Sequence, residues 1–445
     1  VPGGVDLLVL AGDFARPVEQ KGRVGERPVL EDLPAADDHV DLPGRRRPGD
    51  PIRLRARVIQ TAGHEGNLPH FEVHPLRLPS VVDYVADTLR ARYPDLNVPF
   101  HSRWRHFNVG NVDRWAALAA CLPVGDPRER ARVQTELAIT SVLLDAGAGA
   151  AWCYRDPVDG RTYSRSEGLA LASLALYRDG LLSADDRAPQ RADGSTLSDL
   201  SEEVVARCFQ VTADTPRVGL DGRVSLLRRL GRSVVAKPDV FGSDTPRVGA
   251  LFDWLTRYGE IREIEARRVL AAVLELFADV WPDGYRLAGQ NLGDVGHHSY
   301  LASQPQLPGL IPFHKLSQWL TYSLIEPLQS AGITVTGLDA LTGLPEYRNG
   351  GLLVDLGLLQ PRDSTAGSRT HPVDSEFVVE WRALTVAFLD DVATGLRSAL
   401  GRSTEELPLA SVLEGGTWAA GRRCALAKRA DGSPPFTIES AGTVF

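Results

Sequence analysis

From position 52 to position 400, apolar residues recur every three or four positions, a spacing typical of helices with one buried face. The segments that follow this spacing are 52–60, 80–92, 131–144, 166–182, 199–209, 224–230, 248–258, 263–280, 316–330, 352–359 and 375–400. Strands do not alternate with these helices as they do in βαβ units, so a doubly wound parallel sheet is disfavoured. Residues 152–154 and 161–163 flank a Pro-Val-Asp-Gly turn and predict a small hairpin. We therefore predict a mainly α, multi-helical fold with minor β hairpins, and an irregular segment over 413–445.

The chain divides by composition into three parts. Residues 1–52 are rich in Pro and Gly and contain the run Arg45-Arg46-Arg47, so we expect a poorly ordered tail or a misassigned start. Residues 53–195 are interpreted as an N-terminal helical region. Residues 196–445 are interpreted as a C-terminal helical region that carries the active site.

Charge and cysteine content exclude several classes of function. The net charge of −8 argues against a nucleic-acid partner, because neutralising a phosphate backbone needs an excess of Lys and Arg. Four cysteines lie far apart without a CxxC pair, which favours neither a disulfide framework nor a zinc knuckle. Without a long apolar run or a signal-peptide pattern, we expect a cytoplasmic protein that does not contact a membrane and acts on a small molecule. The oligomeric state is left open.

Lys315 and Glu346 are the residues that point most directly to chemistry. Only four of the 49 basic residues are lysines, and Lys315 is the one in an apolar setting, where a titratable amine has a use that Arg cannot serve. Glu346 follows Pro345 and precedes Gly350-Gly351, so we expect its carboxylate to project from a turn that the glycines loosen. A carboxylate and an amine can stabilise an oxocarbenium-like centre, activate water or assist a leaving group. The alternative is a surface ion pair near the start of a helix.

Other polar clusters suggest ligand contacts. On a helix beginning near Pro312, His314 and Gln318 would share one face and Lys315 and Trp319 the next. A short aromatic segment contains three cationic or titratable residues, Arg103, Arg105 and His106, which are candidates for binding a phosphate. Solvated arginines around a buried Trp explain this segment equally well. A metal-dependent amidohydrolase would need ligands such as Asp294, His297, His298 and His314, a set without a recognised metal-binding spacing.

The sequence resembles the uracil catabolism protein 4 family over residues 53–445. The segments that carry the resemblance are His101–Phe107, Thr140–Ala150, Phe313–Tyr322, Leu341–Gly351 and Glu414–Gly421. The resemblance implies a role in a uracil degradation route that passes through a ribosylurea compound and releases urea.

The C-terminal part also resembles queuosine 5′-phosphate N-glycosylases, which are helical proteins similar to helix-hairpin-helix DNA glycosylases. The matching positions are Phe313, Lys315, Gln318, Leu341, Thr342, Glu346, Tyr347, Arg348, Leu356, Gly357, Leu359, Ser375, Glu376, Glu380, Arg382 and Ala383. This resemblance implies Lys315 and Glu346 as the catalytic pair, although those enzymes have Asp at the position of Glu346.

Together these observations predict an N-ribosidase that cleaves ribosylurea or its 5′-phosphate without a metal or organic cofactor. Glu346 would stabilise the ribosyl cation or activate water, and Lys315 would position Glu346 or assist departure of urea. Ribose or urea would be bound by Arg348, Tyr347, Gln318, His314 and Asp294. The alternatives are the metal-dependent amidohydrolase and a non-catalytic nucleotide-binding protein of the same pathway.

Overall fold

The computed structural model of the protein describes residues 51–439 apart from 123–125, 146–148, 150, 282–283, 288–289 and 305–308. The expected tail at 1–52 therefore lies almost entirely outside the described residues. The rest confirms a mainly helical fold with minor strand pairs. The finer expectation of a glycosylase-like arrangement stays a prediction. None of the described helices combines the length and apolar character needed to cross a bilayer.

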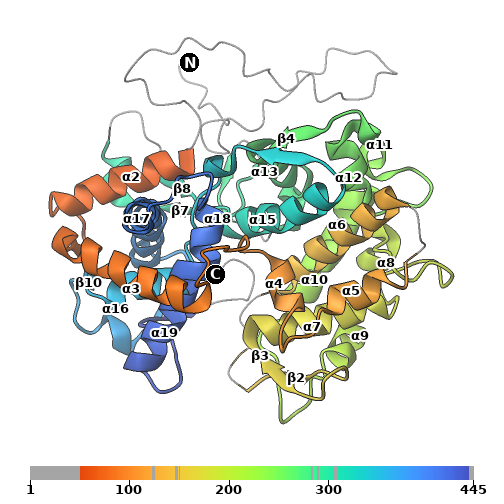
Figure 1. Cartoon of the computed structure of the whole chain (residues 1–445), viewed down its shortest axis with the longest axis horizontal. Helices are drawn as coiled ribbons and strands as arrows, with labels where there is room; N and C mark the ends of the chain where they lie inside the picture. The colour runs from red at the N-terminus through yellow and green to blue at the C-terminus, as the bar shows by residue number, and fades with distance from the viewer. Residues whose placement is uncertain are drawn as a thin grey trace.

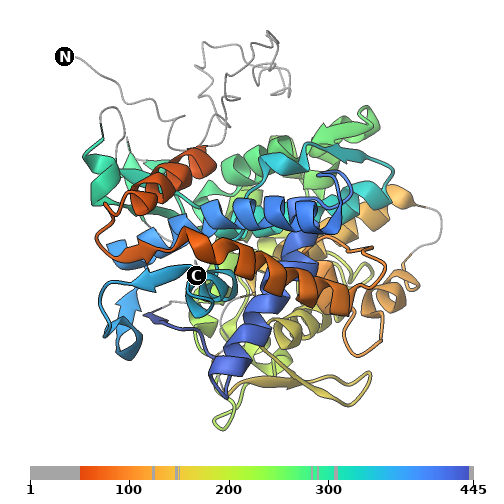
Figure 2. The ribbon, with the colours of Figure 1, turned by 60° about the vertical axis from the view of Figure 1, so that its left-hand side comes forward.

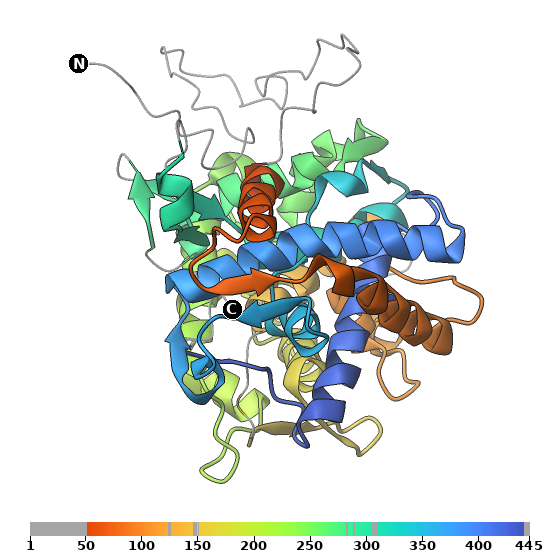
Figure 3. The ribbon, with the colours of Figure 1, turned by 90° about the vertical axis from the view of Figure 1, so that its left-hand side faces the viewer.

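One group of helices joins the two ends of the described chain, and we call it the terminal lobe. Figure 1 shows α17 end-on between α2 and α3, and Figure 3 shows it from the side. Its helices are α2 (Pro51–His64), α3 (Leu78–Arg92), α16 (Tyr347–Asp355), α17 (Glu376–Leu400), α18 (Leu409–Ser411), the π-helix Val412–Thr417 and α19 (Trp418–Lys428). Arg53 and Arg57 of α2 form ion pairs with Asp390 and Asp391 of α17, at 2.7 and 2.6 Å.

The middle of the chain forms the central lobe. Helix α15 packs along α6 and α13, and α10 packs against α8. The main helices of this lobe are α4 (Arg103–Phe107), α5 (Arg114–Ala119), α6 (Pro127–Leu143), α7 (Arg165–Arg178), α8 (Gly194–Ser198), α9 (Glu202–Cys208), α10 (Leu220–Val235), α11 (Pro238–Phe241), α12 (Ala250–Leu255), α13 (Ala266–Leu276) and α15 (Lys315–Ser330). The short helix α14 (Ser299–Ala302) packs instead against α2 of the terminal lobe. Figure 2 shows that the two lobes lie against one another rather than at the ends of a linker.

Short strand pairs connect these helices. The antiparallel pairs are β1 (Phe71–Val73) with β10 (Leu359–Pro361), β2 (Cys153–Arg155) with β3 (Thr162–Ser164), β5 (Arg286–Leu287) with β6 (Gln290–Asn291), and β7 (Val295–His297) with β8 (Leu310–Pro312). The parallel pairs are β4 (Glu263–Glu265) with β9 (Thr334–Thr336), and β11 (Thr370–Pro372) with β12 (Thr437–Glu439). The β2–β3 pair confirms the predicted hairpin.

The prediction of an irregular segment over 413–445 is wrong in its first half. Residues 412–417 form a π-helix that continues directly into α19. The Gly415-Gly416 pair hid this helix in the sequence, because glycine is a poor helix former. Both glycines lie where a side chain would collide with α3 or its extension: a Cβ would come within 2.7 Å of Val98 at Gly415 and 2.8 Å of Val85 at Gly416.

Candidate active site

A cavity of about 360 Å³ opens where the terminal and central lobes meet. In Figure 1, α16 and α19 lie on one side of this junction, α4 and α7 on the other, and α15 above. The described residues that line the cavity are His101, His106, Asp145, Gly149, Arg165, Ser166, Leu169, Lys315, Leu316, Trp319, Leu344, Glu346, Tyr347, Arg348, Trp418, Asp431, Gly432, Ser433 and Pro434. The structure thus brings five of the residues predicted from sequence to one cavity: Lys315, Glu346, Tyr347, Arg348 and His106.

Glu346 is the N-cap of α16. It has an extended backbone, and its two carboxylate oxygens accept hydrogen bonds from the N–H groups of Arg348, at 2.9 Å, and Asn349, at 2.7 Å. An N-cap carboxylate is stabilised by these donors and by the positive end of the helix dipole. Glu346 is therefore held in one position as an anion at the cavity wall.

The glycines after Glu346 do not loosen a turn, as the sequence suggested. Gly350 and Gly351 lie within α16, where a Cβ would come within 2.8 Å of Trp381 or 3.1 Å of Pro435. They permit the close packing of α16 against its neighbours. The carboxylate of Glu346 consequently projects from the rigid start of a helix rather than from a mobile loop.

Lys315 is the first residue of α15 and lies, partly buried, in the wall of the same cavity. Burial and the nearby Arg382 lower the pKa of Lys315 to about 8, while Glu346 and Asp294 act in the opposite direction. Near neutral pH the side chain can therefore exist as either an ammonium or an amine. The alternative considered from sequence is confirmed where it puts Glu346 at the start of a helix, but Glu346 and Lys315 line the cavity rather than an open surface.

Three other candidates, Asp294, His314 and Gln318, lie behind the cavity and position the start of α15. The carboxylate of Asp294 accepts two hydrogen bonds from Arg382, at 2.8 and 2.7 Å, and a third from the Lys315 N–H at 2.9 Å. The helix begins at Lys315 rather than near Pro312, because His314 adopts a left-handed backbone with φ of 48°. Burial lowers the pKa of His314 to about 4. Gln318 accepts a hydrogen bond from the Thr342 N–H.

The three predicted phosphate ligands, Arg103, Arg105 and His106, are placed differently from one another. Arg103 is fully buried and pairs with Asp145 at 3.0 Å. Arg105 pairs with Glu326 and does not line the cavity. His106 does line the cavity, but burial and the charge of Arg103 lower its pKa to about 4. Of the three, His106 alone is among the described residues that line the cavity, and its lowered pKa leaves it neutral near pH 7.

Sequence reasoning missed a buried pair, in which His101 lines the cavity and Glu414 lies behind it. The Nδ1 atom of His101 is 2.8 Å from a carboxylate oxygen of Glu414, which belongs to the π-helix. The imidazole packs against Trp319 and Trp418, with ring centroids 4.6 and 5.8 Å away. Glutamate can fix the tautomer of such a histidine and leave its other nitrogen to exchange a proton with a ligand. The sequence could not indicate this pair directly. It forms at a π-helix, and although π-helical turns are common at functional sites, they have no clear sequence pattern.

The candidate metal ligands do not converge. The Nε2 atom of His298 contacts Glu380 at 2.9 Å, and its Nδ1 atom accepts the Tyr300 N–H. Asp294 is bound to Arg382 as described, and His297 is exposed. Within the described ranges, no three His, Cys, Asp or Glu side chains are grouped as metal ligands. The donor set that the amidohydrolase hypothesis needs is therefore not assembled by these residues.

Comparison with known proteins places the chain in a family. Residues 47–445 match the family described as a protein of unknown function (DUF1688), so the chain belongs to that family. It is 37% identical over 404 residues to Protein urg3 of Schizosaccharomyces pombe, covering 88% of this chain and 96% of that protein. It is 33% identical over 419 residues to uracil catabolism protein 4 of Lachancea kluyveri, covering 86% and 93% of the two chains. The resemblance to the uracil catabolism protein 4 family is thereby confirmed.

Proposed function

We propose that this protein takes part in uracil catabolism as an N-ribosidase, hydrolysing ribosylurea or its 5′-phosphate to urea and ribose or ribose 5-phosphate. The observation that carries the proposal is the capped carboxylate of Glu346 facing a cavity that also contains Lys315. The pathway is supported by a relative that carries the name uracil catabolism protein 4 and is similar over most of the chain.

The arrangement suits cleavage of an N-glycosidic bond. As the bond between the anomeric carbon and nitrogen breaks, positive charge develops on the ribose ring, and a fixed anion nearby stabilises that charge. Glu346 is such an anion, and its two backbone hydrogen bonds hold it in place before the reaction. Water supplies the hydroxyl group of the ribose product and the proton that urea gains, so the balance needs no other reactant.

Lys315 has two roles open to it. As an ammonium it can position Glu346 or give a proton to the departing urea nitrogen. A pKa of about 8 lets the side chain lose and regain a proton in the neutral range. The size of the cavity, about 360 Å³, suits a ligand no larger than a nucleotide.

The test is to incubate the purified protein with ribosylurea and with its 5′-phosphate, and to assay urea and the pentose product. We expect urea release by the wild type and a loss of at least 100-fold in Glu346→Gln, which keeps the shape of the side chain but removes its charge. Asp126→Asn is the matched control, because Asp126 caps α6 through the N–H groups of Arg128 and Glu129 far from the cavity. A fully active Glu346→Gln would contradict the assignment.

The same assay distinguishes the alternatives. Release of ammonia instead of urea, abolished by chelation, would favour a metal-dependent amidohydrolase. Binding of either compound without any product over a long incubation would favour a non-catalytic binding protein.

A further inference from the structure

We infer that the end of the cavity formed by Arg348 and Arg165 binds a phosphate monoester, so that the substrate is the phosphorylated riboside rather than the free one. The choice of riboside rests on the proposed function, whereas the anion subsite stands on the side chains themselves. Arg348 was predicted from sequence as a ligand of ribose or urea, and the phosphate was assigned to other residues.

Arg348 is a buried cation whose hydrogen-bonding capacity is unused. Only 5% of the residue is exposed, and within the described part of the chain neither Nη1 nor Nη2 has a hydrogen-bond partner. Its guanidinium lies over the ring of Trp418, with Cζ 4.1 Å from the centroid. A stacked guanidinium presents its N–H groups at the edge, where they match two oxygens of a phosphate. Leaving such donors unpaired is costly, so a ligand is the natural partner.

Arg165 extends the positive wall next to Arg348. It has a left-handed backbone with φ of 54°, unusual for a residue with a side chain, at the point where β3 passes into α7. One of its guanidinium nitrogens donates to the carbonyl of Asp431, which anchors the side chain at the cavity. Ser166 and Ser433 also line the cavity, and a serine hydroxyl can serve as a further donor to an anion.

Two acidic residues near this end are already paired with other arginines. Glu167 pairs with Arg422 at 2.9 Å, and Asp355 accepts two hydrogen bonds from Arg429. Asp431 lines the cavity and accepts the Ser433 N–H at 3.0 Å. Arg348 therefore has no carboxylate partner within hydrogen-bonding distance among the described residues.

The position of Arg348 relative to Glu346 fits a single pentose phosphate. Glu346 is the N-cap of α16 and Arg348 is two residues later in the same first turn. A ribose with its anomeric carbon at the carboxylate would direct its other end, the 5′ position, along the wall that contains Arg348. Binding energy from the phosphate, remote from the reacting bond, can then orient the sugar for cleavage.

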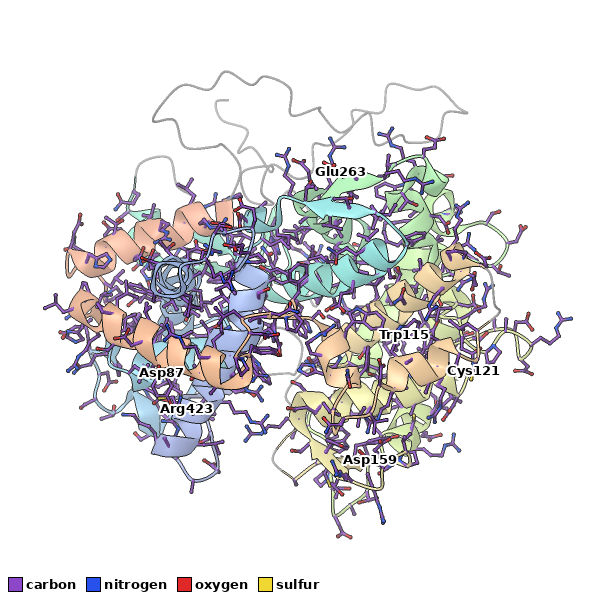
Figure 4. The ribbon with its side chains drawn as sticks, in the orientation of Figure 1. Asp87, Trp115, Cys121, Asp159, Glu263 and Arg423 are labelled. Carbon is purple, nitrogen blue, oxygen red and sulfur yellow. The ribbon has the colours of Figure 1, made fainter. Side chains whose placement is uncertain are left out.

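Calorimetric titration of the full chain with ribose 5-phosphate, ribose and inorganic phosphate tests this inference. We expect ribose 5-phosphate to bind at least tenfold more tightly than ribose, and Arg348→Gln to lose at least tenfold in affinity for ribose 5-phosphate and for inorganic phosphate. Arg348→Lys keeps the positive charge but not the two parallel donors of the guanidinium, so its affinity for ribose 5-phosphate should lie between those of the wild type and Arg348→Gln. The matched control is Arg130→Gln, because Arg130 is also stacked on a tryptophan, Trp115, labelled in Figure 4 on the central lobe away from the cavity. It should bind as the wild type does.

The outcomes separate this inference from the proposed function. Equal binding of ribose and ribose 5-phosphate, or unchanged binding by a folded Arg348→Gln, would overturn the subsite even if urea is released. Loss of phosphate binding in Arg105→Gln but not in Arg348→Gln would also overturn it. Phosphate binding that depends on Arg348 without any urea release would support the subsite and contradict the N-ribosidase. If Arg348→Gln fails to fold, Arg165→Gln serves as the second variant, and wild-type affinity in it would contradict the inference.

Discussion

At the scale of single residues, the site depends on a few charges whose surroundings fix their protonation. Lys315 is the clearest example. Its pKa of about 8 means that the ammonium predominates below pH 8 and the amine above it. If the ammonium assists departure of urea, urea release should decline as pH rises through about 8. In Lys315→Arg this decline should vanish, because Arg does not titrate there. A pH profile of kcat for both proteins measures this, and an alkaline decline that persists in Lys315→Arg would assign it to another group.

The same lysine affects stability with a definite sign. Because folding lowers its pKa, the unfolded chain binds a proton more tightly than the folded one between pH 8 and 10.5, so stability from this group rises with pH over that window. Lys315→Met should remove the cost of burying the ammonium, about 1–3 kcal/mol after allowing for partial exposure. We expect the variant to be more stable than the wild type at pH 7 and the difference to shrink by pH 10, as measured by urea denaturation. A difference independent of pH would show that packing, not charge, is responsible.

Glu414 gives a pH dependence of the same sign in an acidic window. Burial opposes its ionisation, but the hydrogen bond and charge of His101, together with His106 and Arg92, lower its pKa below the ordinary value. Its contribution to stability is therefore present near neutral pH and lost as the pH falls below about 4.5. Glu414→Gln should cost about 1–3 kcal/mol at pH 7 and less at pH 4, because protonation of this carboxylate in the unfolded chain has begun there. Urea unfolding at both values measures the difference, with Glu203→Gln on the exposed start of α9 as the control; an equal cost at both values would contradict it.

At the scale of elements, the site depends on how closely α16 and α19 approach one another. A Cβ at Gly421 of α19 would overlap the backbone carbonyl of Arg348. Gly421→Ala should therefore move α16, cost about 1–3 kcal/mol of stability and weaken ribose 5-phosphate binding together. Ala427→Ser adds one atom to the exposed face of the same helix and should change neither quantity. Loss of stability with unchanged affinity would show that α16 holds its position without this contact.

The helices themselves were largely predictable from the sequence, whereas their exact ends were not. The recurrence of apolar residues identified α2, α3 and α10, which each bury one side, and also α6, α7, α15 and α17, which are buried nearly all round over much of their length. The sequence interpretation that began a helix near Pro312 placed the start of α15 three residues early, since nothing in a single sequence indicates that His314 adopts a left-handed backbone. It missed the π-helix and α19, because the glycines that weaken helix propensity are there for close packing. In the site, sequence reasoning found Glu346 and Lys315 but not His101 and Glu414, which are 313 residues apart and meet only through the fold.

At the scale of the whole molecule, the cavity exists only because the two ends of the described chain return to each other. Residues 51–92 form α2 and α3, yet both helices pack on α17, and α6 packs on α15. A fragment of residues 1–195 would therefore expose Ile52, Ile59, Val81, Val85 and Leu89, which are at most 2% exposed in the whole protein. Each such side chain contributes about 1.5–3 kcal/mol, so their sum approaches the entire stability of an ordinary domain.

We accordingly expect the fragment 1–195 to remain unfolded or to aggregate, and the full chain to unfold in one transition by both far-ultraviolet circular dichroism and tryptophan fluorescence. Ribose 5-phosphate should raise the melting temperature of the full chain in both signals together, because its cavity is lined by helices of both lobes and only the assembled form binds it. Arg348→Gln should lose that increase, and Arg130→Gln should keep it. Two results would contradict this: a cooperative unfolding transition in the fragment alone, or two transitions in the full chain of which the ligand shifts only one. Either would show that residues 1–195 fold as an independent unit and that the cavity forms where two separately folded domains meet.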